Sequence, residues 1–244
     1  ELLGRALSGR RDEVFLATKF NGRMGDEPWR AGSSRRWIVQ AVEDSLRRLN
    51  TDHIDLYQAH RPDPSTELEE TLEALDLLVR QGKIRYYGTS VRGGDGLVEA
   101  QWAAERRGLI RPSTEQVPYS LLIRQIERST LPVARRHGLG VLSYGPLAAG
   151  WLSGGYRRGA EQPTSSRAEL IAGRYDLDAP QNEAKLTAAT ALAELAESRG
   201  LTLIELALGF VLSHPDISSV IVGPRTLAHL DSYVAASATV LDDE

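Results

Sequence analysis

Two side chains that can support proton transfer each stand at the end of an apolar run. Lys19 ends the run that begins at Val14, and His60 ends the run that begins at Ile54. A lysine that ends a buried strand loses hydration unless a carboxylate or a ligand compensates its charge. An imidazole can donate a hydrogen bond to a substrate oxygen or move a proton. We predict Lys19 and His60 as catalytic residues; the alternatives are a lysine that reaches the rim and a histidine bonded to backbone.

Three later runs end in groups that suit a flat ring bearing an amide. They supply the hydroxyl of Ser90, the carboxamide of Gln116 and the aromatic face of Tyr144. Ser90 and Gln116 can bond an amide, and Tyr144 can stack on the ring. The alternative for each is a polar residue that only lines the interior.

The last apolar run ends in a turn that suits a phosphate group. Gly223 permits close approach to the backbone, a helix begins near Thr226, and Arg225 adds a fork of donors. The turn contains no acidic residue. By analogy with dinucleotide-binding folds, this favours the 2′-phosphate of NADP over the free ribose hydroxyl of NAD.

Alternating apolar runs and helical patterns predict the elements that position these residues. The predicted strands are Val14 to Lys19, Ile54 to His60, Ile84 to Ser90, Thr114 to Val117, Gly140 to Tyr144 and Ser219 to Gly223. The predicted helices are Arg36 to Leu49, Glu67 to Gln81, Leu97 to Arg107, Arg124 to Arg136, Glu183 to Arg199, Leu203 to Ser213 and Thr226 to Ala236.

Strands that alternate with helices predict a parallel α/β fold in one domain over residues 1–244. A (β/α)8 TIM barrel needs eight strands, and six are found. No GxGxxG motif follows a strand, and this argues against an open, doubly wound sheet that binds a dinucleotide. The chain opens as if inside a helix, so we expect a barrel that lacks its first two strands here; the alternative is a native six-stranded protein. Residues 151–182 form a long segment of little periodicity, which we expect to be functional or disordered.

Composition narrows the function classes. There are 29 Lys and Arg residues against 33 Asp and Glu residues, a net charge of −4, and no cysteine. This argues against a nucleic-acid partner and excludes thiol nucleophiles and cysteine–zinc sites. The histidines lack metal-ligand spacing, so no metal site is expected. No apolar stretch is long enough for a membrane span, and a cytoplasmic location is the default.

With these residues assembled, the chain resembles an aldo-keto reductase. The resemblance covers essentially the whole chain and rests on blocks in the family's order. The most specific block runs from Val42 through Thr51 to His60. The others are Glu1 to Leu7, Leu16 to Lys19, Gly82 to Ser90, Tyr144 to Leu147 and Val222 to Arg225.

The resemblance implies an NADPH-dependent (β/α)8 barrel that reduces aldehydes and ketones with a catalytic Asp, Tyr, Lys and His. Lys19 and His60 match the last two, and the Asp and Tyr would lie upstream of Glu1. Ser90 and Gln116 would bind the nicotinamide amide, and Tyr144 would stack on its ring. The segment Gly145 to Gly150 would wrap the pyrophosphate, with Gly145, Pro146, Leu147 and Gly150 as its contact residues. Arg225 would meet the 2′-phosphate, in the turn where Gly223 permits close approach to the backbone.

The chain departs from the family at three positions. Val91 stands where many members have Asn beside the serine. His229 and Tyr233 stand where Gln and Asn often contact the adenine and its ribose, and His229 is kept as a cofactor candidate.

Three functions remain open. The first is a reductase of small carbonyl compounds, in which Lys19 would lower the pKa of the upstream Tyr and His60 would orient the carbonyl. The second is a catalytically silent NADPH-binding module or an unstable fragment, since residues 1–244 would hold no Tyr acid. The third is a complete small α/β binding protein or lyase.

Overall fold

A computed structural model describes residues 1–157, 171 and 173–241. The chain divides by its internal contacts into two compact units. Unit 1 comprises Glu1–Val117 and Glu127–Val141, and unit 2 comprises Pro118–Ile126 and Leu142–Glu244. The prediction of a single domain stays a prediction. Among the described residues, no helix is both long and apolar enough to cross a membrane.

Among the described residues, six strands form one sheet, and they follow one another in chain order. They are β1 (Ala17–Phe20), β2 (Ile54–Ala59), β3 (Ile84–Ser90), β4 (Thr114–Pro118), β5 (Gly140–Tyr144) and β6 (Ile217–Ile221). The pairs β1–β2, β2–β3 and β3–β4 are parallel. A parallel pair needs a crossover connection, usually a helix, between its strands. The predicted α/β fold with six strands is confirmed.

Helices supply these crossovers. The α-helices are α1 (Leu2–Ala6), α2 (Arg35–Leu49), α3 (Leu68–Arg80), α4 (Gly94–Arg106), α5 (Thr130–His137), α7 (Glu183–Ser198), α8 (Leu203–Ser213) and α9 (Leu227–Ala236). Short 3-10 helices are η1 (Arg11–Glu13), η2 (Gln125–Arg128), η3 (Ala148–Gly150) and η4 (Pro180–Asn182).

Four strands have different bounds from those predicted. β2 ends one residue early, at Ala59, so His60 follows the strand, and β4 ends one residue late, at Pro118. The differences at β1 and β6 are larger.

β1 begins at Ala17 and not at Val14, because the N–H of Leu16 donates to the carboxylate of Asp55 (2.8 Å) and so does not join the ladder. Val14 remains exposed before the strand. β6 covers Ile217–Ile221, so Gly223 lies beyond the strand and in the turn that follows.

The predicted helix from Arg124 to Arg136 is interrupted. Its first part is the 3-10 helix η2, and α5 begins only at Thr130, after Ser129 has adopted a non-helical conformation. Pro132 then falls in the first turn of α5, where its missing N–H is not needed. α4 begins at Gly94, three residues before the predicted Leu97.

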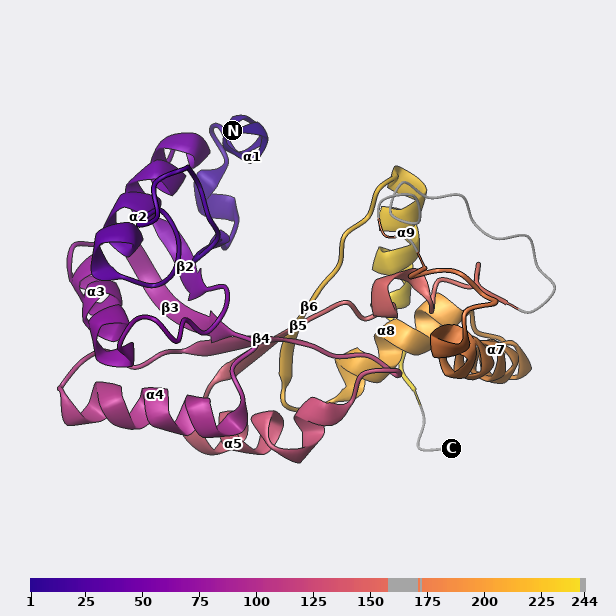
Figure 1. The fold of residues 1–244 in the computed structure, drawn as a ribbon. Coiled ribbons are helices and arrows are strands. Elements are labelled where there is room, and N and C mark those ends of the chain that lie inside the picture. The colour runs from indigo at the N-terminus through magenta and orange to yellow at the C-terminus, as the bar shows by residue number, and fades with distance from the viewer. Residues whose placement is uncertain (158–170, 172, 242–244) are drawn as a thin grey trace. The chain divides into compact units, whose positions relative to one another are not determined.

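In unit 1, α2 and α3 lie over the strands β2 and β3 (Figure 1). Their apolar faces bury a core with the outer side of the sheet, in which Trp37, Ile38 and Leu75 pack with Tyr57 and Tyr87. Ser34 caps α2 by accepting the N–H of Trp37. The core therefore fixes the direction of each strand and the loop at its end.

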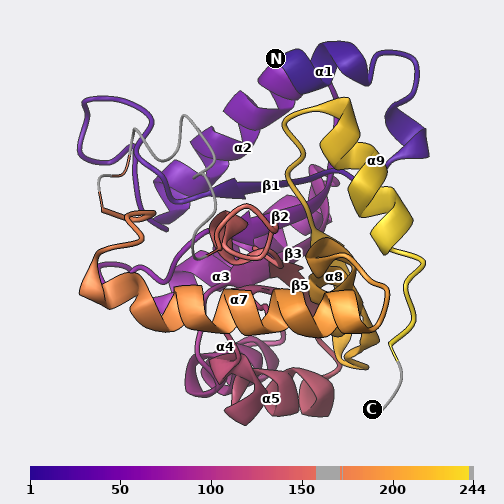
Figure 2. The same cartoon turned by 90° about the vertical axis from the view of Figure 1, so that its right-hand side faces the viewer.

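In unit 2, α8 contacts α7 and α9 (Figure 2). It also contacts β6. Thr202 and Glu205 form a capping box at the start of α8. A second core gathers Trp151, Tyr156 and Tyr175, with the rings of Tyr156 and Tyr175 stacked at 5.2 Å. Within the long segment 151–182, residues 158–170 and 172 lie outside the described residues.

Candidate functional site

The strand register places the polar candidates of unit 1 on one face of the sheet. Lys19 is aligned with Gln58, Gln58 with Gly88, and Ser90 with Gln116. Aligned residues of parallel strands share a face, as do residues two apart on one strand. The residues on this face, near the carboxyl ends of the strands, are Lys19, Gln58, Ser90 and Gln116, and His60 follows the last residue of β2.

Lys19 and His60 stand at the ends of neighbouring strands. The N–H of His60 donates to the carbonyl of Phe20 at 3.2 Å, which ties the end of β2 to the end of β1. Burial lowers the pKa of the half-buried Lys19. Desolvation lowers the pKa of His60, and the charges of Arg61 and Lys19 lower it further. Lys19 and His60 therefore interact electrostatically, and His60 favours its neutral form at neutral pH.

A partly buried carboxylate, that of Asp63, joins the loops that follow these two strands. Asp63 accepts hydrogen bonds from the N–H of Ser33 (2.6 Å), from Ser65 and from Thr66. These bonds lower the pKa of Asp63 against the opposing effect of burial. Gly32 has φ +81°, and a Cβ there would lie 2.5 Å from the Asp63 carboxylate. The loop after β1 is thereby held against the loop that carries His60.

Ser90 and Gln116 meet at the ends of β3 and β4. The carbonyl of Gln116 accepts both the Ser90 hydroxyl (2.9 Å) and the N–H of Val91 (2.9 Å). The carboxamide of Gln116 bonds no described residue, so it can offer a donor and an acceptor to a ligand. Val91 has φ 58°, a left-handed conformation that costs a β-branched residue on the order of 1–3 kcal/mol.

Behind this pair lies Glu115, which is fully buried. Its carboxylate accepts the hydroxyl of Thr89 and the N–H of Arg92, the latter at 2.8 Å. Burial raises the pKa of Glu115 to about 7, although these two bonds and the Arg92 charge favour the ionised form. Glu115 aligns with Thr89 and so faces away from Ser90 and Gln116.

In unit 2, the segment after β5 has an unusual backbone. Gly145, Ala148, Ala149 and Gly150 all have positive φ. Successive N–H groups in such conformations form concavities that bind anions. The hydroxyl of Tyr175 donates to the carbonyl of Ala149 (2.8 Å) and so fixes the turn. Tyr144, which precedes it, is partly exposed.

The turn before α9 also suits an anion. Arg225 is exposed, and its N–H donates to Nδ1 of His229 at 3.5 Å. Thr226 caps α9 by accepting the N–H of His229. A Cβ at Gly223 would meet nothing within 4 Å, so the backbone is open to a ligand there. The ring of His229 stacks with that of Tyr233 at 6.4 Å.

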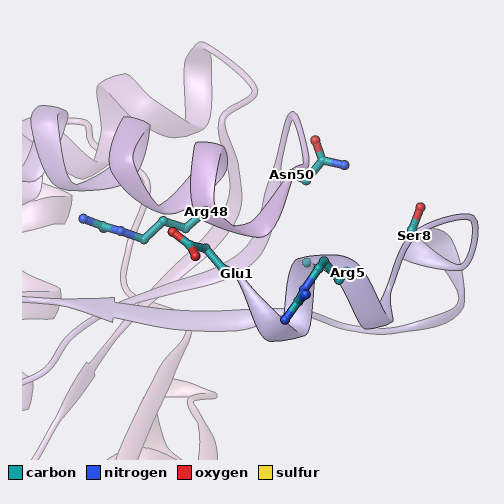
Figure 3. A pocket seen from close by; sticks show the side chains of 6 residues that line it. Glu1, Arg5, Ser8, Arg48 and Asn50 are labelled. Carbon is teal, nitrogen blue, oxygen red and sulfur yellow. The ribbon is translucent and has the colours of Figure 1, made fainter.

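A cavity of about 660 Å³ lies elsewhere in unit 1, between α1 and the end of α2 (Figure 3). Its lining residues are Glu1, Gly4, Arg5, Ser8, Arg48 and Asn50. Asn50 ends α2 and so leads into the start of β2, whereas Lys19 and His60 stand at the carboxyl ends of their strands. This cavity is therefore separate from the candidate site.

Sequence reasoning overlooked three residues of unit 1. Gln58 shares the face of Lys19, and its buried Oε1 atom has no partner among the described residues. Its position two residues before His60 was a usable signal, since alternate strand residues share a face. Glu115 and Asp63 act through their contacts with other residues, so no pattern of residue types in the sequence predicted their roles.

The fold and the strand-end residues define an α/β barrel protein with a polar site at the carboxyl ends of its strands, where such proteins carry their chemistry. A sequence model of the Aldo/keto reductase family matches residues 1–244. The chain belongs to this family, and it is an oxidoreductase. The predicted family is confirmed.

Two of three similar proteins carry names that agree with this assignment, and the third is named as a channel subunit. The uncharacterized oxidoreductase YrpG of Bacillus subtilis is 38% identical over 240 residues, which cover 96% of this chain and 70% of that protein. The aldo-keto reductase YhdN of the same species is 33% identical, with 100% and 72% covered. A probable voltage-gated potassium channel subunit beta of Arabidopsis thaliana is 36% identical, with 91% and 69% covered.

Proposed function

We propose that this protein reduces small aldehydes or ketones to alcohols with NADPH as the hydride donor. The observation that carries the proposal is the single face of the sheet that bears Lys19, Ser90 and Gln116, with His60 directly after the end of β2 beside Lys19. Lys19 and His60 can support proton transfer, and the carboxamide of Gln116 can bind an amide. The partner is a small carbonyl compound, and no nucleic acid or membrane takes part.

The residues present fit NADP(H) in each unit. In unit 1, the uncommitted carboxamide of Gln116 and the Ser90 hydroxyl suit the nicotinamide amide. In unit 2, Tyr144 offers an aromatic face for a flat ring, Gly145, Pro146, Leu147 and Gly150 would border a pyrophosphate, and Gly223, Arg225 and His229 would bind the 2′-phosphate end. The unusual backbone after β5 and the open turn before α9 support these assignments.

When bound, NADPH supplies a hydride to the carbonyl carbon. His60, favoured as neutral imidazole, would donate a hydrogen bond to the carbonyl oxygen and orient it. Lys19 is half-buried and forms no ion pair among the described residues. Its ammonium would lower the pKa of the tyrosine that the family carries upstream of this segment and that gives the proton.

A second candidate is an NADPH-binding protein without turnover. The observation that favours it concerns Tyr57, the tyrosine nearest His60 in sequence. Tyr57 aligns with Thr18 and therefore lies on the face opposite Lys19. Burial also raises its pKa, so it is a poor acid. Residues 1–244 alone would then bind the cofactor but leave carbonyl compounds unchanged.

The test compares the protein with all residues that its gene places before Glu1 against residues 1–244 alone. NADPH binding is followed by quenching of tryptophan fluorescence, and turnover by loss of NADPH absorbance with a panel of aldehydes and ketones. The proposal expects binding and turnover by the whole protein. Binding without turnover by both chains supports the second candidate, and no binding by the whole protein overturns both.

A further inference from the structure

We propose that Glu115 is a positioning residue for the nicotinamide site. Its carboxylate holds the segment Thr89 to Arg92, and through it the hydroxyl of Ser90 and the carboxamide of Gln116. This inference rests on the proposed function, because it gives Ser90 and Gln116 an amide to bind. Glu115 itself faces the opposite side of the sheet and touches no ligand on the face of Lys19.

The carboxylate and the neighbouring carbonyl hold the end of β3 at four points. One oxygen of Glu115 accepts the Thr89 hydroxyl, and the other accepts the N–H of Arg92. The carbonyl of Gln116 accepts the hydroxyl of Ser90 and the N–H of Val91. Every residue from Thr89 to Arg92 is thus bonded to one of two consecutive residues of β4. We call these four residues the β3 corner.

The β3 corner needs this restraint because Val91 has a left-handed backbone at φ 58°. A β-branched residue relaxes from that conformation unless the surrounding structure fixes it on both sides. The N–H of Val91 is fixed by the carbonyl of Gln116, and the next N–H is fixed by Glu115. Without Glu115, the chain after Val91 could relax, and Ser90 would move with it.

A carboxyl group is suited to this role, because its two oxygens can accept from two directions at once. Glu115 is fully buried, so its bonds do not compete with water. Arg92, whose N–H also donates to it, contributes the charge that favours its ionised form. A side chain that only filled space would not need these two acceptor oxygens.

The test measures NADPH affinity in variants of the whole protein. Glu115→Leu removes both acceptors and is expected to weaken NADPH binding roughly 10-fold or more. Glu115→Gln keeps an acceptor and a polar partner for Thr89, so its affinity is expected within about 3-fold of wild type. The matched control is Asp76→Leu, because Asp76 is also buried in unit 1 and accepts a backbone N–H, that of Ile110 (2.9 Å). The control is expected to lose stability but to keep its NADPH affinity.

Rescue separates positioning from general stability. Glycine adopts positive φ without strain, so Val91→Gly added to Glu115→Leu is expected to restore most of the lost affinity. A double variant that binds no better than Glu115→Leu would overturn the inference, as would a Glu115→Leu protein that binds like wild type.

A measurement on the wild-type protein applies even if Glu115→Leu does not fold. Hydrogen exchange of the Arg92 amide without cofactor is expected to be strongly protected compared with that of Arg23, an exposed loop residue after β1. Equal exchange at the two amides would overturn the inference. Failure of wild type to bind NADPH would instead overturn the proposed function, and the two failures are therefore distinct.

Discussion

The β3 corner of unit 1 and the turn from Gly223 to Thr226 in unit 2 are built differently. In the corner, buried acceptors on Glu115 and Gln116 bond four consecutive residues. In the turn, the Arg225 side chain is exposed and a Cβ at Gly223 would meet open space. The corner is fixed before any ligand arrives, whereas the turn offers an exposed positive charge.

This difference suggests separate roles in binding. A rigid, buried corner loses little entropy when a ligand docks, so it can orient an amide precisely. An exposed arginine attracts phosphate over a distance but is screened by salt. We therefore expect a Lys19 variant to change turnover, a Glu115 variant to change the binding and orientation of the nicotinamide, and variants in the unit 2 turn to change cofactor affinity and its salt dependence.

The largest expected effect is on turnover. Lys19→Met in the whole protein is expected to lower kcat by about 10³-fold, since support of proton transfer contributes 10² to 10⁴. NADPH affinity, measured by fluorescence quenching, should change less than about 2-fold, because Lys19 is assigned to the proton and not to the cofactor.

The matched control for this variant is Lys83→Met. Lys83 stands before the first residue of β3, at the other end of a strand, and pairs with Glu43. Its loss should leave kcat within about 2-fold of wild type. Equal losses in both variants would mean that unit 1 responds to any lost lysine, and the catalytic role of Lys19 would be withdrawn.

The next effect concerns the pH dependence of stability. Glu115 has a pKa of about 7 when folded against 4.5 in its ordinary state, so the folded protein binds this proton more tightly. The stabilisation of the folded protein by this tighter proton binding is complete below pH 4.5 and is lost as the pH rises to about 7. Relative to Glu115→Gln, wild type should lose about 2–3 kcal/mol of unfolding free energy between pH 5 and pH 8.

Urea unfolding at the two pH values measures this difference. Arg92 is the charged side chain that stabilises the ionised carboxyl, so Arg92→Gln should enlarge the loss. Parallel pH profiles for wild type and Glu115→Gln would show that the carboxyl does not titrate in this range, and the β3 corner would then be less buried than the structure indicates.

A third effect tests the unit 2 turn. Arg225→Gln is expected to weaken NADPH binding roughly 30-fold, the effect of one charge-assisted bond of about 2 kcal/mol, and to leave NADH binding unchanged. Arg225→Lys keeps the charge but loses the fork, so an intermediate loss is expected. The wild-type affinity should also fall with salt more steeply than that of Arg225→Gln. Equal losses for NADPH and NADH would place Arg225 away from the 2′-phosphate.

The sequence predicted the elements better than the contacts between them. Apolar runs located the six strands of the described residues. β2 is buried at five of its six residues, as expected for a strand covered on both faces, whereas no residue of β6 is buried. The start of β1 was wrong since it depends on Asp55, whose bond to Leu16 is a contact between distant residues. Lys19 and His60 were found because a charge at the end of an apolar run is conspicuous. Glu115 was not, because its importance comes from burial and from the backbone strain at Val91.

The smallest expected effect tests whether the turn from Gly223 to Thr226 is ordered before the ligand binds. Thr226→Ala removes the cap that accepts the His229 N–H and is expected to cost about 1 kcal/mol of stability. If the turn is shaped by the ligand, NADPH affinity should fall only about 2- to 5-fold, because the first turn of α9 must then be ordered on binding. Thr202→Ala, at the cap of α8 in the same unit, is the control that should cost similar stability without loss of affinity. A loss of affinity in Thr226→Ala as large as that of Arg225→Gln would mean that the turn is preorganised by its cap, in the same way that the β3 corner is by Glu115.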